Sequence, residues 1–200
     1  MTTHRLAATA VAGALMLLVT GCAGTEPAAG DPTTDTSTAG GSWAERSVGP
    51  VVLKIPEDWT ELSRSDDGAS GVTTATFGLP DDGSTVRPGI TVSIQEEPTR
   101  DASAEAESLV LGERAQRGAE DVEVAELVRS DAELAVGVSL WNEQRSAEGP
   151  VEVASRWVVA DLAGGEQVVV GVLGPKDEFA ELPLDEVLDA VELAPESDPS

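Results

Sequence analysis

The feature that most constrains the fold is a run of alternating apolar and small or polar residues between positions 134 and 172. Alternation at a period of two is typical of β-strands that bury one face. The run divides into stretches 134–141, 151–160 and 168–172, and the segment Ala163-Gly164-Gly165 predicts a hairpin turn before the last of them. Because direct hairpins join antiparallel neighbours, this half of the chain predicts a mainly antiparallel sheet.

More strands are predicted before and within this region. The alternation of Val51, Leu53 and Ile55 predicts a strand that Pro56 ends, and the following turn leads Trp59 into another short strand. A turn is expected at 65–68. Further strands are predicted at 72–77, 90–94 and 122–124.

Two segments have helical patterns. Ala, Glu, Leu, Gln and Arg dominate residues 101–117, with Asp101 as the expected N-cap and Gly118 as the stop. Near the C-terminus Leu184, Val187, Leu188 and Val191 share one helical face. The predicted fold class is therefore α+β, with a curved, mainly antiparallel sheet, an inserted helix, and a C-terminal helix packed on the sheet.

The N-terminus has the three parts of an export signal. Basic residues His4 and Arg5 precede an uncharged run, and small residues follow it. The sequence Val19-Thr20-Gly21-Cys22 then looks like the lipobox of a bacterial lipoprotein. It predicts cleavage before Cys22, an S-diacylglycerol and an N-acyl chain on that residue, and an exported protein anchored to the outer face of the cell membrane. The alternatives are an ordinary secretory signal with a chance cysteine and a short buried helix.

These features divide the chain into four parts. Residues 1–21 are predicted to be a lipoprotein signal peptide, and 22–41 the lipidated cysteine with a flexible polar tether. Residues 42–194 are predicted to form a single domain, followed by a disordered tail at 195–200.

Composition excludes several classes of function. The formal net charge of -25 opposes binding to nucleic acid and polybasic docking on anionic lipids. The single His and single Cys both lie at or before residue 22, so the predicted domain has no imidazole or thiol for triads, general acid-base catalysis, or zinc and copper sites. We expect no enzyme, metal or cofactor. A hydrolase using carboxylates alone is the remaining catalytic alternative, but Asp66-Asp67 and Asp81-Asp82 adjoin glycines in predicted turns.

Several short motifs together carry a family resemblance. They are the lipobox at Cys22, Ile55-Pro56-x-x-Trp59, Arg87-Pro88-x-Ile90-x-Val92, and the tail Phe179…Leu184…Val187-Leu188…Val191. In this order of motifs and elements the sequence resembles the LpqN-type lipoproteins of actinobacteria, which belong to a PsbP-like α+β superfamily. The ten Arg against two Lys fit a GC-rich actinobacterial genome. The resemblance implies a non-catalytic envelope protein that binds or helps traffic lipidic or partner molecules.

Five residues are candidates for ligand contact. Trp59, Trp141 and Trp157 are large apolar anchors, and Arg87 and Arg156 are cations. Small residues beside Trp141, at positions 135, 137 and 139, predict a trough on the sheet in which Arg156 holds a carboxylate or phosphate head. The opposing interpretations are that the tryptophans pack in the core, that a helix fills the trough with Arg156 paired to an acid, and that Arg87 is an ion-paired loop residue.

The expected function is that of a membrane-anchored cell-envelope lipoprotein that binds or helps traffic a lipidic ligand. The alternative is an accessory module that docks on an envelope transporter or secretion complex without a small-molecule ligand.

Overall fold

A computed structural model describes residues 42–80, 86–146, 149–177, 179–180 and 182–193. The chain separates into two units, 1–40 and 41–200, and all described residues belong to the second. The predictions for the signal peptide, Cys22, the tether and the C-terminal tail lie outside the described residues. Among the described residues, no helix has the length and apolar character needed to cross a membrane.

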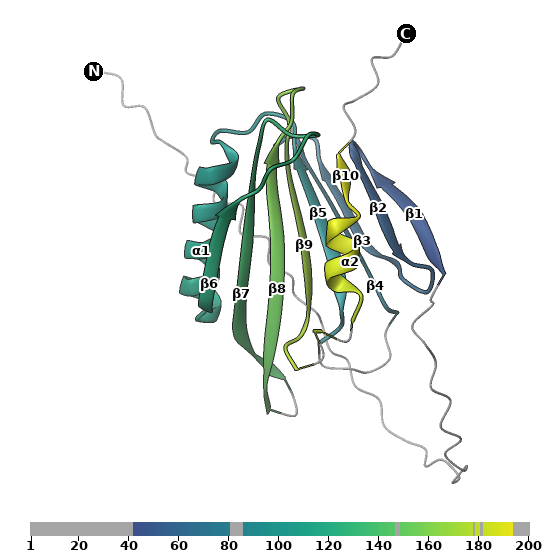
Figure 1. Ribbon diagram of the computed structural model, residues 1–200, viewed down its shortest axis with the longest axis vertical. Coiled ribbons are helices and arrows are strands. Elements are labelled where there is room, and N and C mark those ends of the chain that lie inside the picture. The colour runs from purple at the N-terminus through teal and green to yellow at the C-terminus, as the bar shows by residue number, and fades with distance from the viewer. Residues whose placement is uncertain (1–41, 81–85, 147–148, 178, 181, 194–200) are drawn as a thin grey trace. The chain divides into compact units, whose positions relative to one another are not determined.

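The larger of two sheets has seven strands in the order β3-β4-β5-β9-β8-β7-β6 (Figure 1). Its strands are β3 (Thr60–Asp67), β4 (Val72–Gly78), β5 (Gly89–Gln95), β6 (Glu120–Glu126), β7 (Leu134–Ser146), β8 (Gly149–Asp161) and β9 (Gln167–Pro175). Two meanders, β3-β4-β5 and β6-β7-β8-β9, meet where β5 pairs with β9. Every pairing in this sheet is antiparallel, as the hairpin turns predict.

A second, smaller sheet was not predicted. It consists of β1 (Trp43–Val48), β2 (Val51–Pro56) and β10 (Glu192–Leu193), in the order β1-β2-β10. Strand β1 is mostly exposed and has no apolar alternation, and β10 has only two residues. Neither segment therefore carries the periodic signal on which strand prediction depends.

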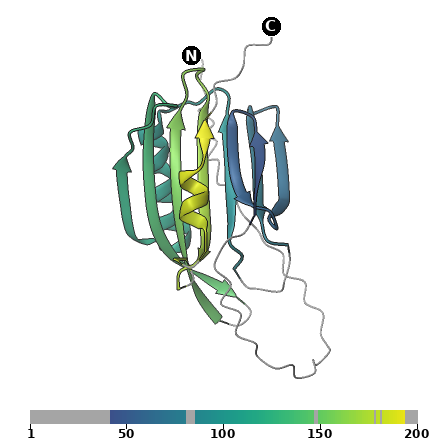
Figure 2. The same cartoon turned by 45° about the vertical axis from the view of Figure 1, so that its right-hand side comes forward.

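The main core lies between the large sheet and a cover made of β2, β10 and α2 (Leu184–Asp189). Fully buried side chains of this core include Leu53, Phe77, Ile90 and Leu184. Figure 2 shows α2 in front of β9, on which it packs. The C-terminal helix on the sheet is thus confirmed, although it ends at Asp189 and Val191 completes the core from beyond the helix end.

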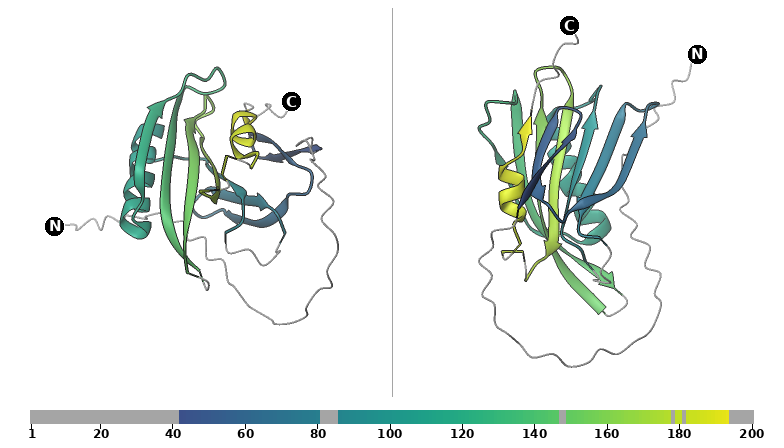
Figure 3. Two further views of the ribbon diagram at one scale, coloured as in Figure 1. Left: turned by 60° about the horizontal axis from the view of Figure 1, so that its bottom comes forward. Right: turned by 90° about the vertical axis from the view of Figure 1, so that its right-hand side faces the viewer.

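Helix α1 (Ala102–Arg117) covers part of the opposite face of the sheet (Figure 3). It packs on β6, β7 and β8 through Ala102, Ala106 and Val110. The Asp101 side chain accepts a hydrogen bond from the backbone N–H of Ala104, and Gly118 ends the helix in the left-handed region at φ 64°. Both predicted caps are confirmed.

The predicted α+β class is confirmed, and one predicted turn differs in position. The turn expected at 65–68 begins later, because β3 continues to Asp67 and pairs with Val72 of β4. Asp67 then accepts hydrogen bonds from the backbone N–H of Ala69 and the Ser70 hydroxyl. The turn is therefore an Asx-type turn that starts at Asp67, the last residue of β3. The predicted turn started two residues earlier, at position 65.

Candidate functional site

The candidate site is the surface of β7 and β8 on the side of the sheet that faces α2. Strand register places Ser139 opposite Arg156 and Trp141 opposite Ala154. The pairs Gly137–Val158 and Ala135–Ala160 continue the same face. We call Ser139, Trp141, Ala154, Arg156 and Lys176 the β7–β8 surface. Arg156 is exposed, and the other four are half-buried.

Leucine side chains fill part of the trough that small residues predict. A Cβ at Gly137 would lie 3.3 Å from the methyl carbons of Leu127, which comes from the segment after β6. A Cβ at Gly174 would lie 2.9 Å from Leu184 and 3.1 Å from Leu182. The absent side chains at these two glycines therefore make room for neighbouring leucines, and the accessible part of the trough is the β7–β8 surface.

Arg156 already has partners on this surface. Its Nη1 lies 2.7 Å from Oδ1 of Asp185, at the start of α2, and both side chains are about half exposed. The contact is an ion pair without hydrogen-bond geometry, because Oδ1 has no hydrogen-bond partner. The guanidinium also lies over the ring of Phe179, 5.7 Å from its centroid. This is the pairing with an acid that the sequence left open for Arg156.

Trp141 forms the apolar part of the surface. Its ring lies under the Lys176 ammonium, with Nζ 3.5 Å from the centroid, and its Nε1 donates a hydrogen bond of 2.6 Å to Asp121. Lys176 also approaches Glu152 to 3.3 Å. Asp121 is held at φ 47° within an irregularity of β6, so this edge of the sheet fixes the orientation of the indole. The β7–β8 surface thus combines the flat apolar ring of Trp141 with two cations, Lys176 and Arg156.

The other predicted contact residues lie elsewhere. Trp59 is 3% exposed and packs in the main core. Trp157 is half-buried on the opposite face of the sheet, where its Nε1 donates to the Ser155 hydroxyl. Arg87 is half-buried just before β5. Of the five predicted contact residues, only Trp141 and Arg156 belong to the β7–β8 surface.

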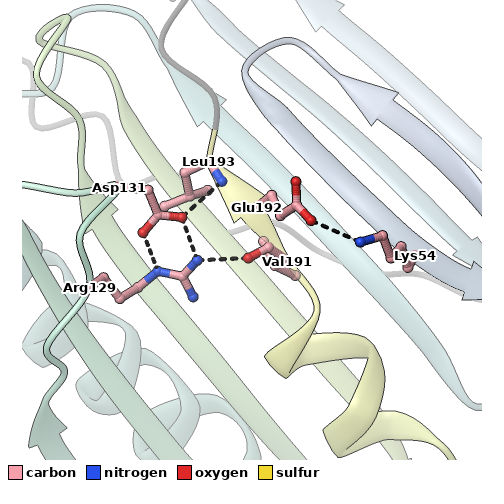
Figure 4. Close-up of polar contacts among 6 residues, drawn as sticks. All are labelled: Lys54, Arg129, Asp131, Val191, Glu192 and Leu193. Carbon is pink, nitrogen blue, oxygen red and sulfur yellow. Dashed lines mark hydrogen bonds and ion pairs between the residues drawn. The ribbon is translucent and has the colours of Figure 1, made fainter.

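Sequence reasoning missed a cluster of polar contacts that holds the C-terminal segment (Figure 4). Arg129 Nε and Nη2 donate to the two carboxylate oxygens of Asp131 at 2.9 and 2.7 Å. Arg129 Nη2 also donates to the carbonyl of Val191, while Asp131 accepts from the backbone N–H of Leu193. We call Arg129, Asp131 and these two backbone groups the C-terminal clasp. An Arg-x-Asp spacing between strands was its only sequence signal.

Ionisable groups with perturbed pKa values have structural explanations. Hydrogen bonds from Arg129 lower the pKa of Asp131, and the backbone N–H of Leu193 acts in the same direction. Burial raises the pKa of Glu105 on α1, with Arg100 partly opposing the shift. Among the described residues, no three His, Cys, Asp or Glu side chains are grouped to hold a metal ion. The chemistry that the β7–β8 surface offers is contact with apolar and charged groups.

No protein-family model and no curated protein matches the sequence. Among solved structures, the chain is similar to LpqN of Mycobacterium tuberculosis, described as involved in cell envelope biogenesis. The match has 15% identity and a TM-score of 0.46, and it covers 78% of this chain and 88% of LpqN. A protein from Bacteroides thetaiotaomicron matches with 17% identity and a TM-score of 0.39, over 74% of this chain and 46% of the other. Both are likenesses of fold, and no function is carried over from them.

Proposed function

We propose that the chain is a lipid-anchored accessory protein of the bacterial cell envelope that binds its target without transforming it. The observation that carries the proposal is Val19-Thr20-Gly21-Cys22 at the end of an uncharged run. The first strand begins at Trp43, so twenty residues separate Cys22 from the folded unit. A chain of this length lets an acidic domain work at a distance from anionic headgroups that repel it.

Metabolic labelling tests the anchor. Cells expressing the full chain are fed an alkyne-tagged palmitate, and the protein is separated into membrane and soluble fractions. We expect label and membrane association in the wild type, loss of both in Cys22→Ala, and no change in the control Thr25→Ala. Unlabelled wild type, or a mature N-terminus elsewhere than residue 22, contradicts the proposal.

We propose that the β7–β8 surface contacts an amphiphilic ligand with an anionic head. Trp141 supplies an apolar ring beside the Lys176 ammonium, and its neighbours on this face, Ala154 and Ser139, have small side chains. Asp185 holds the exposed Arg156 through an ion pair without a hydrogen bond, so a ligand carboxylate or phosphate with better geometry can compete for the guanidinium. The exposed ion pair itself contributes little to stability.

Native mass spectrometry of protein purified from its own envelope tests this contact. We expect lipids to accompany the wild type and to be lost in Arg156→Glu. The matched control is Arg64→Glu, because Arg64 also forms an exposed ion pair, with Glu61 at 2.9 Å, but on the edge strand β3. Equal lipid retention in both variants rules out the head-group role.

A second candidate function is docking on an envelope membrane protein. The observation that favours it is the flank of β6, where Val124 is 49% exposed and Val128 is fully exposed. Crosslinking in intact envelopes tests docking: a membrane protein whose crosslinking is lost in Val124→Glu and Val128→Glu indicates this function. Loss of bound lipid in Arg156→Glu, measured by native mass spectrometry, indicates lipid carriage instead.

A further inference from the structure

The face of the large sheet that carries α1 has a second area beyond the helix. Helix α1 packs on β6, β7 and β8, while β9, β5, β4 and β3 continue the same face toward the β3 edge. In Figure 3, α1 lies beside β7 on one side of the sheet, and α2 with the small sheet lies on the other. This area is thus on the opposite side of the sheet from the β7–β8 surface.

Hydroxyl side chains form two cross-strand rows in this area. Register aligns one row across β3, β4 and β5 as Ser63, Thr76 and Thr91, and the next row as Ser65, Thr74 and Ser93. We call these six residues the hydroxyl face. The serines of β3 are exposed, Thr74, Thr91 and Ser93 are half-buried, and Thr76 is 9% exposed. Adjacent strands place hydroxyls in a row about 4.8 Å apart.

The hydroxyls keep hydrogen-bonding capacity after pairing with one another. Thr76 and Thr91 lie 3.3 Å apart and share a hydrogen bond, and Thr74 donates to Ser93 at 3.4 Å. Each hydroxyl has one donor and two acceptor positions. A pair that shares one hydrogen bond therefore retains one donor and three acceptor positions, so the face can both donate and accept.

An indole ring borders the first row. Thr91 pairs with Gly171 of β9, and Gly171 pairs with Trp157 of β8. A Cβ at Gly171 would lie 2.0 to 2.5 Å from three ring carbons of Trp157. The indole thus lies over Gly171, against the sheet, and occupies the place where a side chain would stand between Trp157 and Thr91. Glycine at 171 is required for this placement.

The rows are uncharged in a strongly acidic protein. Neither row contains a charged residue from β3 to β9, where Gly171 and Val169 complete the two rows, although the formal charge of the chain is -25. Neither row offers a charge contact to a partner. The neighbouring charge on this face is Asp67 of β3, whose carboxylate already accepts hydrogen bonds from Ala69 and Ser70. A neutral ligand that carries many hydroxyl groups matches both the polarity of the rows and their lack of charge.

We propose that the hydroxyl face with Trp157 is a binding surface for a neutral glycan. Sugar hydroxyls exchange hydrogen bonds with the Ser and Thr rows, and the apolar face of a pyranose ring contacts the indole, as aromatic side chains with one apolar and one polar aspect allow. The surface goes beyond the amphiphile contact proposed above and is independent of Arg156 and of the anchor at Cys22.

Native affinity electrophoresis of the full-length protein tests the proposal. The protein is kept in a polyoxyethylene detergent, which has no sugar head, and runs through gels containing mannan, arabinogalactan or hydroxyethyl cellulose. We expect at least one neutral polymer to retard the wild type, and carboxymethyl cellulose, which is anionic, not to retard it. Trp157→Ala and the double variant Thr74→Val with Ser93→Ala should each raise the apparent dissociation constant about tenfold.

Two controls keep the test decisive. Trp43→Ala removes an exposed indole of β1 that lies outside the hydroxyl face and should bind as the wild type does. The Thr74→Val change preserves a β-branched shape, so its loss of binding is read together with an unchanged urea unfolding midpoint. The proposal fails if no neutral polymer retards the protein, if the variants bind as tightly as the wild type, or if light scattering shows that the face joins two copies of the chain instead.

Discussion

Removing the carboxylate of Asp131 tests how much the C-terminal clasp contributes to stability. The carboxylate accepts two hydrogen bonds from Arg129 and one from the backbone N–H of Leu193. A hydrogen bond to a charged group contributes about 1.5–3 kcal/mol, and an exposed ion pair about 0–1 kcal/mol. The Arg129 and Asp131 side chains are 18% and 27% exposed. We therefore place the loss in Asp131→Ala within the range for a hydrogen bond to a charged group, at about 2 kcal/mol.

Urea denaturation followed by tryptophan fluorescence measures this loss. Four tryptophans contribute to the emission, and Trp59, which is 3% exposed in the core that β10 helps to cover, makes the signal sensitive to the unfolding of that core. With a urea m-value of about 1–3 kcal/mol per molar, a loss of about 2 kcal/mol lowers the midpoint by about 1 M. The corresponding fall in Tm is about 4–8 °C for a domain of this size.

Glu61→Ala is the matched control for the clasp. Glu61 also accepts hydrogen bonds from an arginine, Arg64, but both side chains are at least 40% exposed on the edge strand β3. Solvent screens this pair, so we expect no measurable shift of the midpoint. Equal shifts in Asp131→Ala and Glu61→Ala would refute the argument that burial and the contacts with β10 make the clasp stronger.

Three further predictions concern ionisable groups. Arg129 lowers the pKa of Asp131 from its ordinary 3.8. The wild type should therefore exceed Asp131→Asn in unfolding free energy by the full amount above pH 3.8. This difference should disappear as the pH falls through the lowered pKa of the folded state. Burial raises the pKa of Glu105 from its ordinary 4.5, so stability is lost as the pH rises through the raised folded value. Glu105→Gln should therefore raise the urea midpoint at pH 7. The control Glu107→Gln, at an exposed position of the same helix, should leave the midpoint unchanged. Asp101→Ala should cost about 1 kcal/mol in urea denaturation through loss of the α1 cap, and Asp101→Asn, which keeps a capping oxygen, much less.

The elements that sequence patterns predicted are those whose signal is local. Alternation identified β2, β7 and β8, because a strand with one buried face must alternate. The caps of α1 were predictable because Asp101 and Gly118 act on backbone groups within a few residues. Strands β1 and β10 were missed because they depend on β2, which pairs with both. Tertiary pairing supplies the information that their own residues lack.

In the candidate site, too, local sequence patterns predicted some features and tertiary packing decided the others. Alternation alone requires Arg156 and Trp157, as neighbours on one strand, to face opposite sides of the sheet, so they do not share a site. It also places Ser139 and Trp141 on one face. What covers that face is not local: Leu127, Leu182 and Leu184 reach it from other elements and fill the positions next to Gly137 and Gly174. A row of small residues therefore predicts close packing as well as it predicts a trough.

The two faces of the sheet are specialised by what α1 and α2 leave uncovered. Helix α2 covers β9 and leaves Arg156 exposed and Trp141 half-buried beside it, whereas α1 covers β7 and β8 and leaves five of the six residues of the hydroxyl face exposed or half-buried. The pairing of β5 with β9 aligns the hydroxyl rows of the first meander with the indole of the second. Gly171→Ala tests that alignment, because its Cβ would displace the Trp157 ring while every hydroxyl stays in place. If glycan retardation were unchanged in this variant, with the shift of the indole shown by its fluorescence, the indole would have no part in binding.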